Sequence, residues 1–159
     1  QIPEEDFEPL PQCSSKEYWL MKWVLTEEDE EPLEWLFSHL DLQWVHHPVV
    51  REVLLTALDA HAEHKKPETT YILSRCEHPG AHRFITEAVA EAHDIPNRDR
   101  QYKDYVLLLR GKYIEREIQN QKSQLASGEL NDDAQVEITR LLMELRKMKT
   151  EPLSPLADS

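Results

Sequence analysis

The feature that most constrains this fold is an unbroken helical segment at residues 98–126, RDRQYKDYVLLLRGKYIEREIQNQKSQLA, which contains no proline. Its composition is dominated by residues with high helix propensity. A helix of about 29 residues is roughly 43 Å long, whereas a body of about 80 residues is only about 25–30 Å across. The body therefore cannot cover the whole helix, and the second half of the helix must project outward.

The projecting helix is predicted to fold back on itself as a helical hairpin. Ser127 and Gly128 end it, since glycine readily takes the left-handed conformation that closes a helix. Asn131 is a suitable N-cap for the next helix, and the acidic residues that follow favour a helix N-terminus. This last helix is expected to run to about Lys149.

An apolar seam is expected between the two helices of the hairpin, because apolar residues recur at the spacing of one helix face. On the first helix this face carries Leu107, Gly111, Ile114, Ile118, Gln121 and Leu125. On the second helix the facing stripe carries Ile138, Leu141, Leu142, Leu145 and Met148. Gly111 costs about 1 kcal/mol relative to alanine in a helix interior, and both close packing and a weak hinge are compatible with it.

Residues outside the seam are the candidates for contact with another protein. A face of mixed charge is usually only solvated, but a two-helix arm is marginally stable alone and should gain order on a partner. The predicted contact residues are Tyr113, Arg116, Gln119, Lys122, Arg140, Glu144 and Lys147.

The residues before the long helix, 14–95, are predicted to form a compact helical bundle that remains folded when the chain is cut after Ile95. Ser14 and Glu17 form a capping box at its first helix. Prolines, which the first turn of a helix tolerates, are predicted to open the next four helices at Pro32, Pro48, Pro67 and Pro79. The expected fold class is therefore all-α, a compact bundle followed by a long helix and a C-terminal hairpin at 98–149.

The two ends of the chain are expected to add little structure. Residues 1–13 are rich in proline and acid and are predicted to form a disordered linker. Residues 150–159 are predicted to be a flexible tail. Because the sequence begins with Gln1 and not with methionine, we expect it to be a piece of a longer protein.

The sequence resembles the C-terminal domain of bacterial DnaG-type primases over about residues 16–149. The segment YVLLLRGKYIEREIQNQKSQLASGELNDDAQVEITRLLMELRKMKT matches the family's order of a long helix, a short turn and a final helix. The preceding KEYWLMKWVL and EPLEWLFSHLDLQWVHHPVVREVLLTAL resemble the family's bundle, with a step from Trp44 to Pro48 into the next helix.

This resemblance implies a protein-interaction domain and not a catalyst. In the family, the domain docks on the N-terminal domains of the hexameric replicative helicase, recruits primase to the replication fork and modulates helicase activity and primer synthesis. The parent protein would be a DNA primase, a nucleotidyltransferase of the primosome, in the cytoplasm at the nucleoid-associated fork. The alternative is the N-terminal, self-associating domain of a replicative helicase, which has a related bundle-and-hairpin shape.

Charge argues against direct binding to nucleic acid. Residues 1–94 carry 7 basic and 20 acidic side chains, so their net charge is 7 − 20 = −13, and residues 95–159 carry 11 of each, which gives zero. An acidic body repels a phosphate backbone. No segment approaches the roughly 18 consecutive apolar residues of a membrane span, so no membrane partner is expected.

Catalysis and metal binding are the weaker hypotheses. His61 with His64, and His78 with His82, have helical spacings, and Cys76 lies beside the second pair. A structural zinc site needs four well-placed ligands, and solvated histidines explain the pattern better. No cofactor is therefore expected, although a Cys–His nucleophile pair and a metal-dependent helical hydrolase remain alternatives.

Four tryptophans, at positions 19, 23, 35 and 44, lie early in the bundle. Core packing is the simpler interpretation of such a group. A groove for a partner is the alternative, because tryptophan is enriched at the centres of protein interfaces.

Overall fold

A computed structural model of the chain describes residues 10, 12–78, 80–91 and 98–156. Over these residues it contains seven α-helices and one short 3₁₀ turn and no strand, which confirms the all-α fold class. The elements are α1 (Ser15–Thr26), α2 (Glu30–His39), η2 (Leu42–Trp44), α3 (Pro48–Ala62), α4 (Thr69–Arg75), α5 (Ala81–Ala90), α6 (Arg98–Ala126) and α7 (Asp132–Thr150).

Local capping signals in the sequence determine several helix ends. The Ser14 hydroxyl accepts a hydrogen bond from the backbone N–H of Glu17 at the start of α1, as a capping box predicts. At the start of α7, the Asn131 side chain accepts one from the N–H of Ala134 at 2.8 Å. Gly128 has a φ of 70°, the left-handed conformation expected between α6 and α7.

The prolines predict helix starts less well. Pro48 opens α3 as expected, but α2 begins at Glu30, two residues before Pro32. The acidic first turn favours that earlier start, and proline at the third position costs no hydrogen bond because the first-turn N–H groups have no partner inside the helix. Pro67 instead lies in a tight turn, where the N–H of Glu68 donates to the carbonyl of Lys66, and Pro79 lies outside the described residues.

The bundle core includes the beginning of the long helix. Tyr102, Val106 and Leu109 of α6 are buried in the same apolar cluster as the buried side chains of α1 to α5. This half of α6 packs against α1 and η2. A chain cut after residue 95 would lose these three core side chains, so the expectation that residues 14–95 form a complete body is corrected: the core extends to about Leu109.

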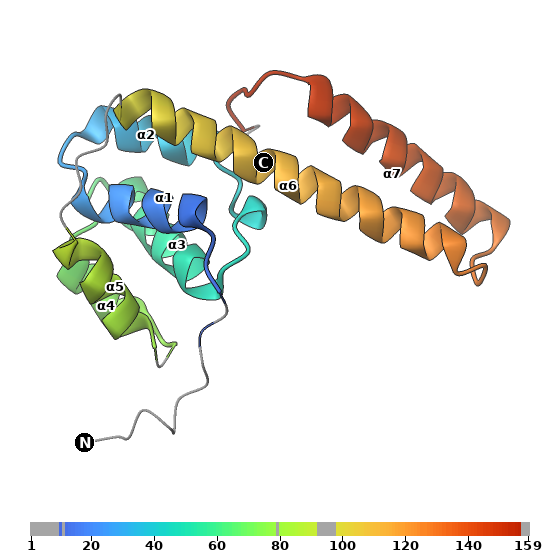
Figure 1. The fold of residues 1–159 in the computed structure, drawn as a ribbon. Coiled ribbons are helices and arrows are strands. Elements are labelled where there is room, and N and C mark those ends of the chain that lie inside the picture. The colour runs from blue at the N-terminus through green and yellow to red at the C-terminus, as the bar shows by residue number, and fades with distance from the viewer. Residues whose placement is uncertain (1–9, 11, 79, 92–97, 157–159) are drawn as a thin grey trace.

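The second half of α6 leaves the bundle and pairs with α7 (Figure 1). Four buried side chains form an apolar cluster of their own there, separate from the bundle core: Ile114, Ile118, Ile138 and Leu142. The length of α6 therefore has the predicted consequence, since its far half is covered by α7 and not by the body.

After α7 the chain returns to the bundle, where a flexible tail was expected. Leu153 is half-buried and packs against the bundle core. The N–H of Leu156 donates a 2.8 Å hydrogen bond to the carbonyl of Ser38, at the end of α2. Residues 151–156 therefore form a strap between the hairpin and the body, because Leu153 gives the segment apolar contacts that a polar tail would lack and the backbone of Leu156 adds a hydrogen bond.

Candidate functional site

The candidate site is the hairpin formed by α6 and α7, and its seam lies largely where the sequence places it. Leu125, Leu145 and Met148 pack around the four buried residues of the cluster, and Leu130 from the connecting turn joins them. Leu141 is half-buried at the edge of the seam. Apolar contacts of this kind hold α7 against α6 along most of its length.

Leu107 is not part of the seam, and its assignment there is corrected. Its side chain is 43% exposed. The reason is the end of α7: the guanidinium of Arg110 donates to the carbonyl of Met148, in the last turn of α7. Leu107 lies almost one turn further back along α6, outside the apolar cluster that α6 and α7 share.

Arg110 joins the hairpin to the body. It is a buried cation within α6, and its guanidinium donates to the Met148 carbonyl, which also accepts a hydrogen bond from the N–H of Glu151 at the end of α7. Cations are also favoured electrostatically at a helix C-terminus. Arg110 thus fixes the end of α7 at the point where α6 leaves the bundle.

Tyr113, predicted to contact a partner, instead lies at the junction between the hairpin and the body. It packs against both apolar clusters, and its hydroxyl donates a 3.1 Å hydrogen bond to the Gln43 side chain of η2. Burial, followed by the nearby charges of Glu117 and Asp41, raises its pKa. Its role in the structure is to orient α6 on the bundle, because its ring has neighbours on both sides.

The outer surface of α7 carries the most exposed large apolar side chains of the described residues. Val136 is 70% exposed and Met143 is 66% exposed, and they lie two turns apart on the same side of the helix. Thr139 and Arg140 lie between them and line the same shallow hollow, together with Asp132 and Gln135. We call these six residues the α7 face.

Val136 and Met143 are not among the contact residues predicted from the sequence. Both lie in a helix that is otherwise polar outside the seam, and single exposed apolar residues are common on protein surfaces. The available signal was their seven-residue spacing, which puts them on one side of α7, opposite the seam.

Arg140 and Glu144 from the predicted contact set do lie at this surface. Arg140 forms ion pairs with both Glu137 and Glu144, all three on the outside of α7. The hydrogen bond with Glu137 is the largest cause of the raised pKa of Arg140 and of the lowered pKa of Glu137. These exposed pairs give the α7 face a fixed pattern of charge beside its two apolar side chains.

The remaining predicted contact residues are exposed along α6 and at the end of α7: Arg116, Gln119, Lys122 and Lys147. Arg116 lines a second shallow groove, of about 550 Å³, which we call the α6 shoulder. The other residues of this groove are Leu107, Leu108, Gly111, Lys112, Glu115 and Lys149. The predicted contact residues therefore do not form one site but divide between the α7 face and α6.

Lys149 forms an ion pair with Glu115 across the two helices of the hairpin. The hydrogen bond from Lys149 is the main cause of the lowered pKa of Glu115. Gly111 lies nearby in α6, and a side chain there would meet no other atom within 4 Å. The structure therefore gives Gly111 no role in close helix packing.

No group of three or more metal-binding side chains comes together among the described residues. The Cys76 thiol is buried, and burial followed by the Glu52 carboxylate raises its pKa to about 12. It is therefore protonated near neutral pH, the opposite of what an activated nucleophile needs.

Comparisons of the chain with models of known protein families, with curated proteins and with solved structures gave no match. The likeness to DnaG-type primases thus remains a prediction from sequence motifs. In the part of the chain that the structure describes, no helix combines the length and the apolar character needed to cross a membrane.

Proposed function

We propose that this chain is a protein-interaction domain that binds its partner through the α6–α7 hairpin. The resemblance to DnaG-type primases suggests that the partner is the hexameric replicative helicase, contacted through its N-terminal domains. Binding would recruit primase to the replication fork and modulate helicase activity and primer synthesis.

The observation that carries this proposal is the exposure of Val136 and Met143 on a hairpin that projects from the body (Figure 1). The seam already holds α7 to α6 through the inner face of the helix, so the α7 face is not needed for folding. Apolar side chains bordered by charged ones are typical of a protein interface, with an apolar centre and a polar rim.

The test is binding of the full chain to the purified hexameric replicative helicase of the same organism, measured by isothermal titration calorimetry. The double variant Val136→Asp/Met143→Asp places two charges on the α7 face and should weaken binding by at least about tenfold. A matched variant, Leu55→Asp/Val89→Asp, makes the same exchange at exposed apolar positions of α3 and α5. It should bind as the unchanged chain does.

A second variant tests the hairpin as a whole without opening the bundle core. Residues 115–146 are replaced by a short Gly–Ser linker, which leaves Arg110 and Met148 in the chain. We expect this variant to fold and to lose helicase binding. Undiminished binding would refute the proposal, and a ring-shaped oligomer of the unchanged chain alone in light scattering would favour the helicase N-terminal domain instead.

A further inference from the structure

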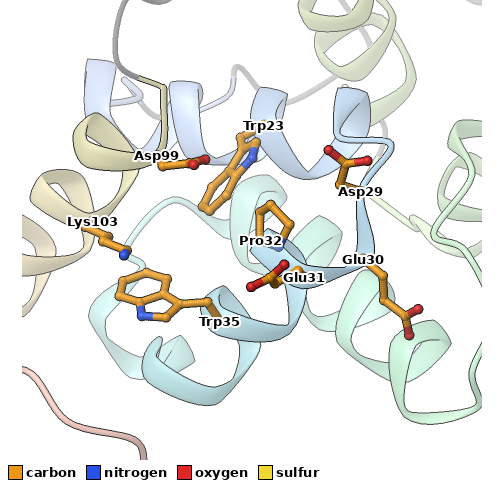
Figure 2. A pocket seen from close by; sticks show the side chains of 8 residues that line it. All are labelled: Trp23, Asp29, Glu30, Glu31, Pro32, Trp35, Asp99 and Lys103. Carbon is orange, nitrogen blue, oxygen red and sulfur yellow. The ribbon is translucent and has the colours of Figure 1, made fainter.

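A pocket with two tryptophans in its walls lies on the body, away from the α7 face. It has a volume of about 560 Å³, which is within the range of ligand pockets. Three segments that are distant in the sequence form it: the end of α1, the start of α2 and the start of α6. Its lining residues are Trp23, Asp29, Glu30, Glu31, Pro32, Trp35, Asp99 and Lys103 (Figure 2).

The charge of this pocket is strongly negative. Four carboxylates and one ammonium line it, which gives −4 + 1 = −3. In Figure 2, the carboxylate of Glu31 points toward the space between the two indoles and that of Asp99 lies beside the Trp23 indole, whereas Glu30 points away. None of the four forms an ion pair with a described residue, in contrast to Glu115, Glu137 and Glu144 of the hairpin.

Arg98, which precedes Asp99 in the chain, has partners outside the pocket. Arg98 lies 3.8 Å from the carboxylate of Glu27, which in turn accepts a 2.6 Å hydrogen bond from the indole N–H of Trp23. Arg98 also donates to the hydroxyls of Thr26 and Tyr102. Arg98 therefore holds α6 on α1, and it forms no ion pair with the four carboxylates of the pocket.

The pocket also has an aromatic surface that holds a cation. The Nζ of Lys103 lies 5.2 Å from the ring centre of Trp35, within the range of a cation–π interaction. Stacking on His39 at 4.5 Å fixes the orientation of the Trp35 ring. Lys103 is itself exposed, so a second cation can take its place beside the indole while its own ammonium returns to water.

The charge of the pocket requires an occupant that carries positive charge. Residues 1–12 and 151–159 contain acidic side chains but no lysine or arginine, so neither of these two segments supplies such a charge. A nucleic acid is repelled by the net charge of −3. A guanidinium suits the site best, because it can stack on an indole and pair with a carboxylate at the same time.

We propose that this pocket binds an arginine-containing basic segment of a partner protein, with the guanidinium between Trp35 and the carboxylates of Glu31 and Asp99. Lys103 acts as an internal competitor that the incoming arginine displaces. The site uses no residue of the α7 face, and Asp99 and Lys103 belong to the half of α6 that packs on the bundle. It is therefore a second interaction surface and does not depend on the proposed helicase contact.

The experiment titrates the full chain with a capped tetra-arginine peptide, with tetra-lysine and tetra-glutamate as companion peptides, by isothermal titration calorimetry at low salt. Tetra-arginine should bind more tightly than tetra-lysine, and tetra-glutamate should not bind. The variant Glu31→Gln/Asp99→Asn should weaken tetra-arginine binding by about tenfold, and Trp35→Leu by about fivefold. Lys103→Gln should strengthen it by about threefold, since the competitor is removed.

A control variant distinguishes binding of the peptide at this pocket from a general electrostatic attraction between a basic peptide and an acidic protein. The variant Asp59→Asn/Glu68→Gln removes the same two charges at exposed positions elsewhere on the body, and should change the affinity less than twofold. Equal weakening by the control and by Glu31→Gln/Asp99→Asn would overturn the proposal. Unchanged affinity in Trp35→Leu, with an unchanged circular dichroism spectrum, would also overturn it.

Discussion

The indole of Trp23 and the phenol ring of Tyr102 stack face to face, with centroids 3.8 Å apart and ring planes inclined by 3°. The first belongs to α1 and the second to α6, and both are buried. Their polar atoms are satisfied at the rim of the core, by Glu27 and Arg98 respectively. The start of the long helix is therefore as much a part of the core as the helices that precede it.

This stacking predicts a large loss of stability in Tyr102→Ala. Removing a buried aromatic ring should lower the free energy of unfolding by about 3–5 kcal/mol. The matched variant Leu108→Ala, at a side chain that is 46% exposed, should lower it by less than about 1 kcal/mol. Urea unfolding followed by circular dichroism measures both values, and similar losses in the two variants would contradict the placement of α6 in the core.

The hairpin should lose stability locally when its seam is weakened. Ile118→Ala, in the separate cluster between α6 and α7, should cost about 2–4 kcal/mol, whereas Leu107→Ala should cost less than about 1 kcal/mol. Hydrogen exchange is the suitable measurement, because the amides of α7 should lose protection while those of α3 keep it. Uniform loss of protection over both helices would instead indicate a single cooperative unit.

The two thiols should make the protein less stable at alkaline pH. Burial, as the largest cause, raises the pKa values of Cys13 and Cys76 from 9.0 to about 12. Between those values the unfolded chain binds fewer protons than the folded one, so the free energy of unfolding falls as the pH rises from 9 toward 12. The stabilisation is fully present below pH 9.

The variant Cys13→Ala/Cys76→Ala tests this pH dependence. Its unfolding free energy should fall less steeply than that of the unchanged chain when urea unfolding is compared at pH 8 and pH 10. In the unchanged chain, Cys76 should react slowly with iodoacetamide at pH 8, because its thiolate is scarce. Equal slopes in the two proteins would exclude the thiols as the cause.

The strap after α7 should make a small contribution to stability. Leu153→Ala removes a half-buried side chain from the bundle and should cost about 1–2 kcal/mol. Leu156→Ala is the matched control, since that side chain is 40% exposed and contributes through its backbone N–H. Thermal unfolding measures the loss of stability in both variants. If Leu153→Ala loses no more stability than Leu156→Ala, the Leu153 side chain does not stabilise the bundle.

The features that depend on neighbouring residues were predictable from the sequence. The long helix was expected at 98–126 and extends from Arg98 to Ala126. The caps at Ser14 and Asn131 and the positive φ of Gly128 also follow from local chemistry. Each needs only a side chain and a backbone group a few positions away, so the sequence contains the whole signal.

Features that depend on the meeting of distant segments were not predictable. Residues 105–109, YVLLL, are apolar on every side, so periodicity could not assign Leu107 to a face; the position of the end of α7 decides it. The tryptophan pocket joins residues 23–35 to residues 99–103, which no spacing rule connects. The strap was missed because a short run rich in proline is usually a tail.

The hydrogen bond between Leu156 and Ser38 reduces the conformational entropy that the chain gains when the hairpin unfolds. With Arg110 at the start and the strap at the end, the hairpin residues between them form a loop that is anchored to the body at both ends. A loop with fixed ends has fewer conformations than a dangling chain of the same length. Opening of the hairpin therefore gains less entropy than the separation of a free terminal arm, and the two helices stay close enough to re-form.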